Sequence, residues 1–155
     1  MAKAIIVYES KYGNTKLVAE AIVSGIREAS ALDPVLAELK EVSPAQLTDF
    51  DAIVVGSPNH MGSATRSIRK LIDSLGKLNL EGKYVSVFDT YMGSDFEKAV
   101  KKMEKQISEK VPQLKLAVPG LSIRVEGMKG PIEEGELPKC KEFGGKIATR
   151  IKELT

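Results

Sequence analysis

Residues 7–15 read Val-Tyr-Glu-Ser-Lys-Tyr-Gly-Asn-Thr, and this stretch decides the fold. It joins an apolar run at residues 4–8 to a segment that has helical periodicity from Thr15 onward. A buried strand that turns through small residues into a helix leaves the first backbone N–H groups of that helix without partners. These groups and the helix dipole together favour the binding of phosphate. The stretch therefore predicts a phosphate site at the start of the first helix.

The rest of the chain alternates between strand and helix patterns. Apolar runs predict strands at residues 4–8, 52–55 and 84–88, and softer patterns predict strands at 35–42 and 121–126. Apolar residues at helical spacing predict helices at 15–29, 66–75, 95–110 and 137–153. This alternation predicts an α/β fold with an open five-stranded parallel sheet, helices on both faces and one domain spanning residues 1–155.

Several details of this prediction can be checked individually. Asp33-Pro34 is a turn signal ahead of the second strand, which we expect near a sheet edge. Phe96 is expected on the inner face of the third helix and Leu154 on the inner face of the last one. In residues 121–126 polar residues alternate with apolar ones, so this strand is expected either to have one wetter face, which would carry Ser122, or to lie at a sheet edge.

The composition excludes several classes of function. The chain has 155 residues with 43% hydrophobic content, and 23 Lys and Arg against 21 Asp and Glu give a net charge of +2. Near-balanced charge gives no argument for nucleic-acid binding, and one histidine excludes a multi-histidine metal centre. The one cysteine, Cys140, suits a reducing compartment, and no apolar run reaches membrane-spanning length. Met1-Ala2-Lys3 stands directly before an apolar strand, so we expect no signal sequence. We therefore expect a cytoplasmic protein without membrane or nucleic-acid partners.

Three loops follow the three apolar strands, at residues 9–15, 56–64 and 89–95. In open parallel sheets, ligands bind outside the carboxyl ends of the strands, where the strand order reverses. The three loops should therefore converge there and form the binding site.

Other phosphate-binding α/β families do not match these loops. A dinucleotide-binding loop needs three glycines, but the first loop contains only Gly13, and a P-loop needs a Gly-Lys-Ser/Thr ending that is absent. A phosphatase of this architecture would have a nucleophilic cysteine in the first loop, which contains none. A response-regulator receiver domain needs acidic residues both after the first strand and at the end of the 52–55 strand. Glu9 meets the first requirement, but Gly56 and Ser57 stand at the second position.

The first loop and its flanks resemble the flavodoxin signature. The eight matching positions are Ile6, Val7, Tyr8, Ser10, Gly13, Thr15, Ala19 and Ile22. Residues 56–62 are also similar to the flavin-gripping loop of that family, and the element order covers nearly the whole chain. The resemblance implies FMN as the cofactor, with its phosphate at residues 10–15 and its isoalloxazine ring between the second and third loops.

The resemblance and the loops together give a set of cofactor-binding residues. In the first loop they are Ser10, Lys11, Tyr12, Gly13, Asn14 and Thr15; in the second they are Ser57, Pro58, Asn59, His60, Met61 and Gly62; in the third they are Asp89, Thr90, Tyr91, Gly93 and Asp95. Tyr91 is expected on one face of the ring and either His60 or Met61 on the other, with the remaining third-loop residues at its polar rim. We assign no catalytic or metal-binding residue.

The resemblance implies a low-potential electron-transfer protein that docks transiently with redox proteins near the flavin edge, as a monomer or a weak dimer. It favours a non-catalytic carrier over two alternatives: a small NAD(P)H-dependent FMN quinone reductase, and a flavodoxin-fold binding module without flavin. Electron-carrying flavodoxins are usually strongly acidic, but here Arg66, Arg69 and Lys70 follow the second loop. We therefore expect a partner surface of a different sign from the familiar one.

Overall fold

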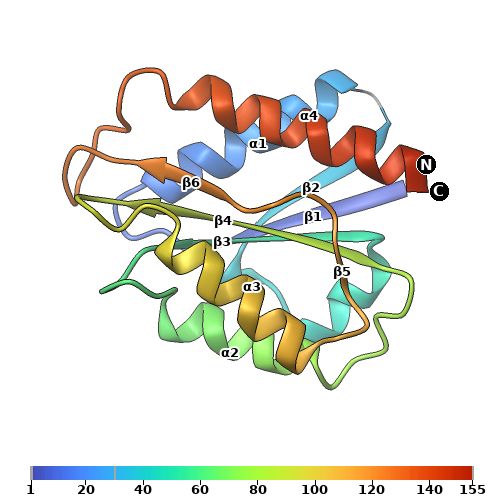
Figure 1. The fold of residues 1–155 in the computed structure, drawn as a ribbon. Coiled ribbons are helices and arrows are strands. Elements are labelled where there is room, and N and C mark those ends of the chain that lie inside the picture. Colours follow the sequence, from blue (N-terminus) through green and yellow to red (C-terminus); the bar gives the residue numbers. More distant parts are fainter. Residues whose placement is uncertain (1, 30, 155) are drawn as a thin grey trace.

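The computed structural model describes residues 2–29 and 31–154 and places a parallel sheet between two layers of helices (Figure 1). The strands are β1 (Ala2–Tyr8), β2 (Leu32–Glu38), β3 (Ala52–Pro58), β4 (Tyr84–Tyr91), β5 (Lys115–Leu116) and β6 (Leu121–Arg124). The α-helices are α1 (Asn14–Ala29), α2 (Arg66–Leu75), α3 (Lys98–Lys110) and α4 (Leu137–Leu154). Two 3₁₀ helices, η1 (Leu39–Glu41) and η2 (Pro44–Asp49), connect β2 to β3.

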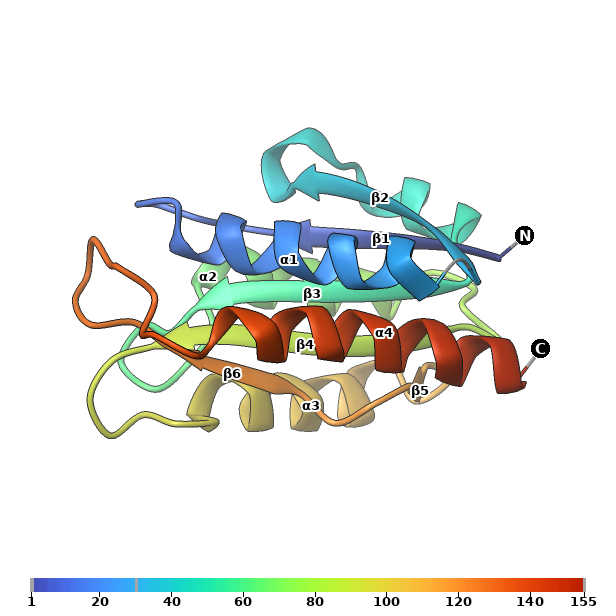
Figure 2. The same ribbon diagram turned by 90° about the horizontal axis from the view of Figure 1, so that it is seen from above.

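The strand order is β2-β1-β3-β4-β5, and every strand pair is parallel (Figure 2). The segment β6 also pairs with β4, farther along it than β5 does, so these two short strands share the fifth position. The predicted five-stranded, doubly wound sheet is therefore confirmed. The order reverses between β1 and β3, and their carboxyl ends face the same edge as that of β4.

Helices α1 and α4 cover one face of the sheet, and α2 and α3 cover the other (Figure 1). Side chains alternate between the two faces along each strand. In β1, Ile6 joins the core under α1 and α4, whereas Ile5 and Val7 join the core under α2 and α3. Because both faces are covered, the central strands are continuously apolar, which is why they were recognisable in the sequence.

The second strand was predicted at 35–42 but occupies Leu32–Glu38, so Asp33 and Pro34 lie within it rather than in a turn. Pro34 has no N–H to donate to a neighbouring strand. The strand tolerates it because β2 is an edge strand paired only with β1, where a missing N–H can face solvent. The predicted edge position is confirmed.

Two details of the predicted helices are wrong: the third helix starts later than the predicted residue 95, and one side chain expected to point inward is exposed near each of α3 and α4. Helix α3 starts at Lys98, and Phe96 lies in the turn before it with 57% of its surface exposed. The turn ends at Glu97, whose φ of 63° lies in the left-handed region and interrupts the helical path. Leu154 lies at the last residue of α4, where it too is exposed.

For residues 121–126 the edge position is confirmed, because β6 pairs with β4 alone among the described strands. A wetter face is wrong for Ser122, which is buried. Its hydroxyl donates to the buried carboxylate of Asp89 over 2.6 Å, which explains the polar residue in a covered strand. Among the described helices, none is both long enough and apolar enough for a membrane span.

Candidate functional site

The turn between β1 and α1 leaves a helix start open toward the carboxyl edge of the sheet. Gly13 has a φ of 94°, which favours glycine, and its carbonyl accepts the first helical hydrogen bond, from Leu17 N–H over 3.0 Å. Ser10 Oγ accepts from Gly13 N–H over 3.0 Å and closes the turn. By helix geometry, the backbone N–H groups of residues 14–16 have no acceptor within α1. Unpartnered N–H groups at the positive end of a helix dipole favour the binding of an anion, so this turn is the candidate phosphate site.

A buried hydrogen bond joins this helix start to the end of β4. The hydroxyl groups of Thr15 and Thr90 lie 2.9 Å apart, and both residues are buried. The link fixes the first turn of α1 relative to the third loop. The start of α1 and the end of β4, from which the third loop leaves, are thus joined directly.

The second loop is a tight turn held by its own strand. Ser57 Oγ accepts from Thr65 N–H over 2.9 Å, which fastens the two ends of the loop. At the tip, His60 and Ser63 exchange backbone hydrogen bonds of 2.7 and 3.0 Å. Met61 and Gly62 between them have φ values of 52° and 87°, as in a type I′ turn, where a methionine is unusual. Met61 is 100% exposed at this tip.

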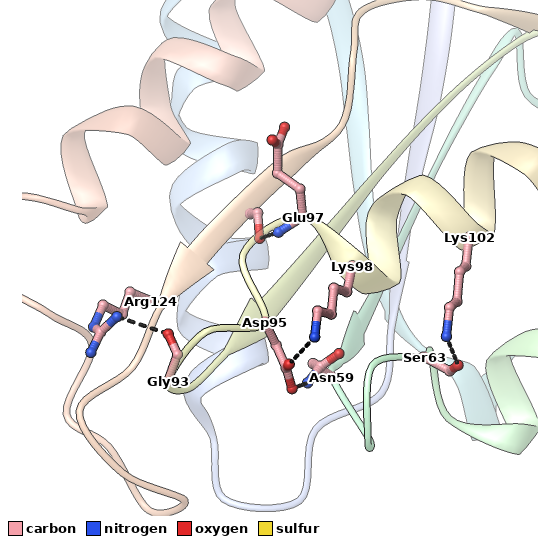
Figure 3. A network of polar contacts seen from close by, with 9 residues as sticks. Asn59, Ser63, Gly93, Asp95, Glu97, Lys98, Lys102 and Arg124 are labelled. Carbon is pink, nitrogen blue, oxygen red and sulfur yellow. Dashed lines mark hydrogen bonds and ion pairs between the residues drawn. The ribbon is translucent and has the colours of Figure 1, made fainter.

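The third loop presents an aromatic side chain and is fastened from β6. Tyr91 is 8% exposed, and Phe96 packs against its ring edge with centroids 5.6 Å apart. Arg124 Nη1 donates to the carbonyl oxygen of Gly93 over 3.0 Å, which holds the turn (Figure 3). Burial raises the pKa of the Tyr91 phenol, so Tyr91 is neutral at physiological pH.

The three loops surround one cavity of about 460 Å³. Twelve predicted residues line it: Ser10, Lys11, Tyr12, Asn14, Thr15, Pro58, Asn59, His60, Met61, Thr90, Tyr91 and Asp95. Its volume lies in the usual range for small-molecule sites. The structure thus brings the phosphate turn and both ring loops together, and cofactor binding by these residues stays a prediction.

Five predicted residues do not line the cavity. Gly13 and Gly62 shape their turns, and Ser57 fastens the second loop from beneath. Gly93 contributes its carbonyl to Arg124, and Asp89 is buried below the third loop. These five residues were predicted to bind the cofactor, but in the structure they shape or anchor the loops and do not line the cavity.

Three cavity residues were missed: Met92, Val125 and Met128. Val125 and Met128 belong to the segment after β6, where Asn14 Nδ2 also donates to the Met128 carbonyl over 3.4 Å. The rule that found the other loops could have found this one, because β6 is parallel and its carboxyl end lies at the same edge.

Asn59 has a buried acceptor without a partner. Its Nδ2 donates to Asp95 Oδ2 over 2.8 Å, and Lys98 forms an ion pair with Asp95 over 3.0 Å (Figure 3). Lys98 and Asn59 both hold the pKa of Asp95 below its ordinary value, so this carboxylate stays ionised. Because the ionised carboxylate requires a donor, the amide orientation is fixed. Asn59 Oδ1 is therefore the free acceptor, buried and without a hydrogen-bond partner.

Asp89 was predicted at the polar rim of a ring, but it anchors α3 instead. It points to the α2 and α3 face, where Oδ2 accepts from Val100 N–H over 3.1 Å and Oδ1 accepts from Ser122 over 2.6 Å. Because Glu97 makes no side-chain cap, Asp89 satisfies the start of α3 from the neighbouring strand. Burial raises the pKa of Asp89 from 3.8 to about 6, although the two hydrogen bonds oppose the rise.

This shifted pKa predicts a specific pH dependence of stability. The native state holds the Asp89 proton more tightly than the unfolded chain, so the free energy of unfolding should fall as pH rises from about 4 to 6 and level off above. The two-unit shift corresponds to about 3 kcal/mol at most. Urea unfolding of the wild type and of Asp89→Asn between about pH 4 and 7.5 checks this prediction. The difference in the free energy of unfolding between the two proteins isolates Asp89, because the contributions of all other carboxylates cancel. A difference that does not fall over this range contradicts the assignment.

The described residues contain no cluster of His, Cys, Asp and Glu that could hold a metal ion. Cys140 lies in the core under α4, where burial raises the pKa of its thiol to about 12. The thiol is therefore protonated at neutral pH, and a protonated thiol is a poor nucleophile.

Comparison with known proteins identifies the arrangement. A family model described as a flavodoxin domain matches residues 5–122. A flavodoxin from the domain Archaea is 30% identical, with 97% of this chain and 99% of that chain covered and a TM-score of 0.82. Flavodoxin 2 from Bacillus cereus is 28% identical, with 96% and 99% covered and a TM-score of 0.80. The Flv1 flavodiiron core from Synechocystis shares the fold at 18% identity and a TM-score of 0.80, covering 99% of this chain but 37% of that one.

Proposed function

Because this chain belongs to the flavodoxin family, we propose that it binds FMN in the cavity described above and carries electrons at low potential between redox proteins. One observation carries the proposal. A continuous cavity joins the open start of α1 to the aromatic and methionine side chains at the ends of β3 and β4. FMN has this same division into a phosphate and a flat, largely apolar ring.

The phosphate end fits a doubly charged anion without a metal. The N–H groups of residues 14–16, the helix dipole, and the side chains of Ser10, Asn14 and Thr15 supply donors. Among the residues that the structure describes, Lys11 is the one lysine or arginine that lines the cavity. Neutral donors around a helix start can balance the charge of a phosphate, as they do in other nucleotide sites.

The ring end fits a flat group with polar atoms along one edge. Tyr91 lies on one side of the cavity and His60 and Met61 come from the facing second loop. The buried Asn59 Oδ1 needs a donor, and the isoalloxazine ring of oxidised FMN has one ring N–H to offer. Asn59 would therefore orient the ring by accepting that hydrogen bond.

Bound FMN supplies the redox chemistry of such a protein. The residues around the cavity bind, orient and shield the cofactor rather than exchange protons with it. The pKa of Asp95 is lowered by Lys98 and that of Tyr91 is raised by burial, so neither group changes its protonation state near pH 7. For these two residues this favours a carrier over an enzyme with its own acid–base chemistry, and His60 is the remaining cavity residue that such chemistry would use.

Titration of the purified, flavin-free chain with FMN tests the cofactor. We expect one FMN per chain, quenched flavin fluorescence and a Kd below about 1 μM, with riboflavin bound at least about 100-fold more weakly because it lacks the phosphate. Equal affinity for FMN and riboflavin would place the phosphate elsewhere. A chain that takes up no FMN supports the flavin-free binding module instead.

Steady-state oxidation of NADPH with a quinone separates the carrier from the reductase. For a carrier we expect the FMN-loaded protein to show negligible NADPH oxidation, yet to pass electrons rapidly to the quinone after chemical reduction. Robust turnover with NADPH by the pure protein would reject the carrier proposal and favour the reductase.

A further inference from the structure

Helices α2 and α3 both begin at the edge of the cavity, and every charged residue in the first five positions of each helix is basic. Their first five residues, 66–70 and 98–102, contain six basic side chains and no acidic one. These cations are Arg66, Arg69, Lys70, Lys98, Lys101 and Lys102, and all six are exposed. Each helix follows a parallel strand, so the positive ends of both dipoles lie at this edge. We call the six residues the basic patch.

Most of this charge is not neutralised within the protein. Lys98 pairs with Asp95 over 3.0 Å, and Lys101 with Glu97 over 3.8 Å. The other four cations of the patch form no ion pair with any described carboxylate. Lys102 instead donates to Ser63 Oγ over 3.1 Å, which holds its charge beside the second loop (Figure 3).

An exposed aromatic side chain adjoins the patch. Phe96 comes two residues before Lys98 and is 57% exposed. The edge contact of its ring with Tyr91 connects it to the wall of the cavity. An exposed aromatic next to unpaired charges has the composition of an interface centre with a charged rim.

We propose that the basic patch and Phe96 form a docking surface for a redox protein whose own docking face is acidic. The inference rests on the proposed function, because electrons would reach such a partner from the flavin in the adjoining cavity. Across the cavity, the segment after β6 carries three exposed charged residues, Glu126, Lys129 and Glu134, so its exposed charge is net negative. Charge of opposite sign on the two sides orients the partner so that its acidic face meets α2 and α3.

The patch suits a protein better than a nicotinamide nucleotide. A nucleotide needs a concave site, but none of the six cations lines the cavity; they lie on the exposed faces of two neighbouring helices. The α3 side chain of Gln106 donates to the Arg69 carbonyl of α2 over 2.9 Å, so the two helices present one continuous surface. Such a surface matches the extent of a protein contact.

Stopped-flow kinetics with the FMN-loaded, reduced chain test this docking. The probes are an acidic acceptor, soluble cytochrome b5, and a basic acceptor, cytochrome c. We expect the second-order rate constant with cytochrome b5 to fall at least about tenfold between about 20 and 300 mM NaCl, and that with cytochrome c to stay flat or rise. The proposal is overturned if the rate constant with cytochrome b5 does not depend on the NaCl concentration, or if the rate constant with cytochrome c falls steeply as NaCl is added.

Matched charge reversals locate the surface. Arg66→Glu with Lys102→Glu should lower the low-salt rate with cytochrome b5 about tenfold and leave the high-salt rate unchanged. The control, Lys77→Glu with Lys115→Glu, makes the same charge change at exposed positions at the other end of α2 and β4, and should stay within about twofold of wild type. Equal effects of both pairs would mean that net charge alone matters, which contradicts a defined surface.

A binding readout keeps the inference separate from the proposed function. In ¹⁵N-labelled full-length chain, with or without FMN, cytochrome b5 should shift the amide signals of residues 66–70 and 98–102 at low salt. Shifts elsewhere, or none, overturn the docking surface. Failure of FMN uptake with these shifts present rejects the proposed function alone, whereas FMN uptake and electron transfer to a quinone without them reject the inference alone.

Discussion

Asn14→Asp is expected to weaken FMN binding about 30- to 100-fold while it stabilises the flavin-free protein. Asn14 is the first residue of α1 and lines the cavity beside the predicted phosphate. A carboxylate there is favoured by the helix dipole by about 0.3–1 kcal/mol when no ligand is bound. The same carboxylate repels a phosphate that carries nearly two negative charges. The substitution should therefore move flavin-free stability and FMN affinity in opposite directions.

Isothermal titration and thermal unfolding measure the two effects. Riboflavin serves as a ligand control: its affinity should change little, because it lacks the phosphate, even though the hydrogen bond from Asn14 to the Met128 carbonyl is lost. Asn79→Asp is the matched protein control, since it makes the same change at an exposed position whose side chain accepts from Glu81 N–H in a remote turn. Equal losses for FMN and riboflavin would show that the substitution disturbs the loop rather than the phosphate.

Gly144→Ala and Gly145→Ala, one residue apart on α4, are expected to change stability in opposite directions. A Cβ at Gly144 would overlap the carbonyl oxygen of Ile22 on α1 and lie 3.1 Å from the backbone nitrogen of Ile26. Backbone atoms cannot move aside as a flexible side chain can, so we expect a loss of about 3 kcal/mol from overpacking. A Cβ at Gly145 has its nearest neighbour, the Gly25 carbonyl oxygen, at 4.0 Å. There alanine should add about 0.5–1 kcal/mol through helix propensity.

Chemical denaturation of the flavin-free proteins checks this pair. Both variants carry the same added methyl group on the same helix, so their difference isolates the close approach of α1 and α4. On the facing helix, a Cβ at Gly25 would overlap the Lys141 carbonyl oxygen, which places the closest approach of the two helices at these glycines. Similar stability of the two variants would mean that the helices can separate at little cost.

The patterns that predicted the fold are local and periodic. A strand covered on both faces has to be apolar at nearly every residue, and a helix on a sheet has to be apolar every three or four residues. For this reason the strands at β1, β3 and β4 and the helix α2 were recognised from the sequence. Loops at the carboxyl ends of these strands then had to converge at one edge.

The errors occurred where a distant residue decides the conformation. Pro34 lies in a strand because that strand is at the edge of the sheet, which no local pattern records. Asp89 was expected at the polar rim of the flavin ring because it begins the loop after the third apolar strand. In the structure it caps α3 and accepts from Ser122, which lies 33 positions further along the chain.

The sequence by itself determined the doubly wound sheet, the three converging loops and the open helix start, where a phosphate is expected to bind. Only the tertiary structure decided which of the loop residues face the cavity and that Asn59 Oδ1 has no hydrogen-bond partner among the described residues. It also decided that the cations of α2 and α3 lie together at the edge of the cavity. The physical reason is that periodicity and turn chemistry act between neighbours in the chain. Hydrogen-bond satisfaction and surface charge depend instead on which segments the fold brings side by side.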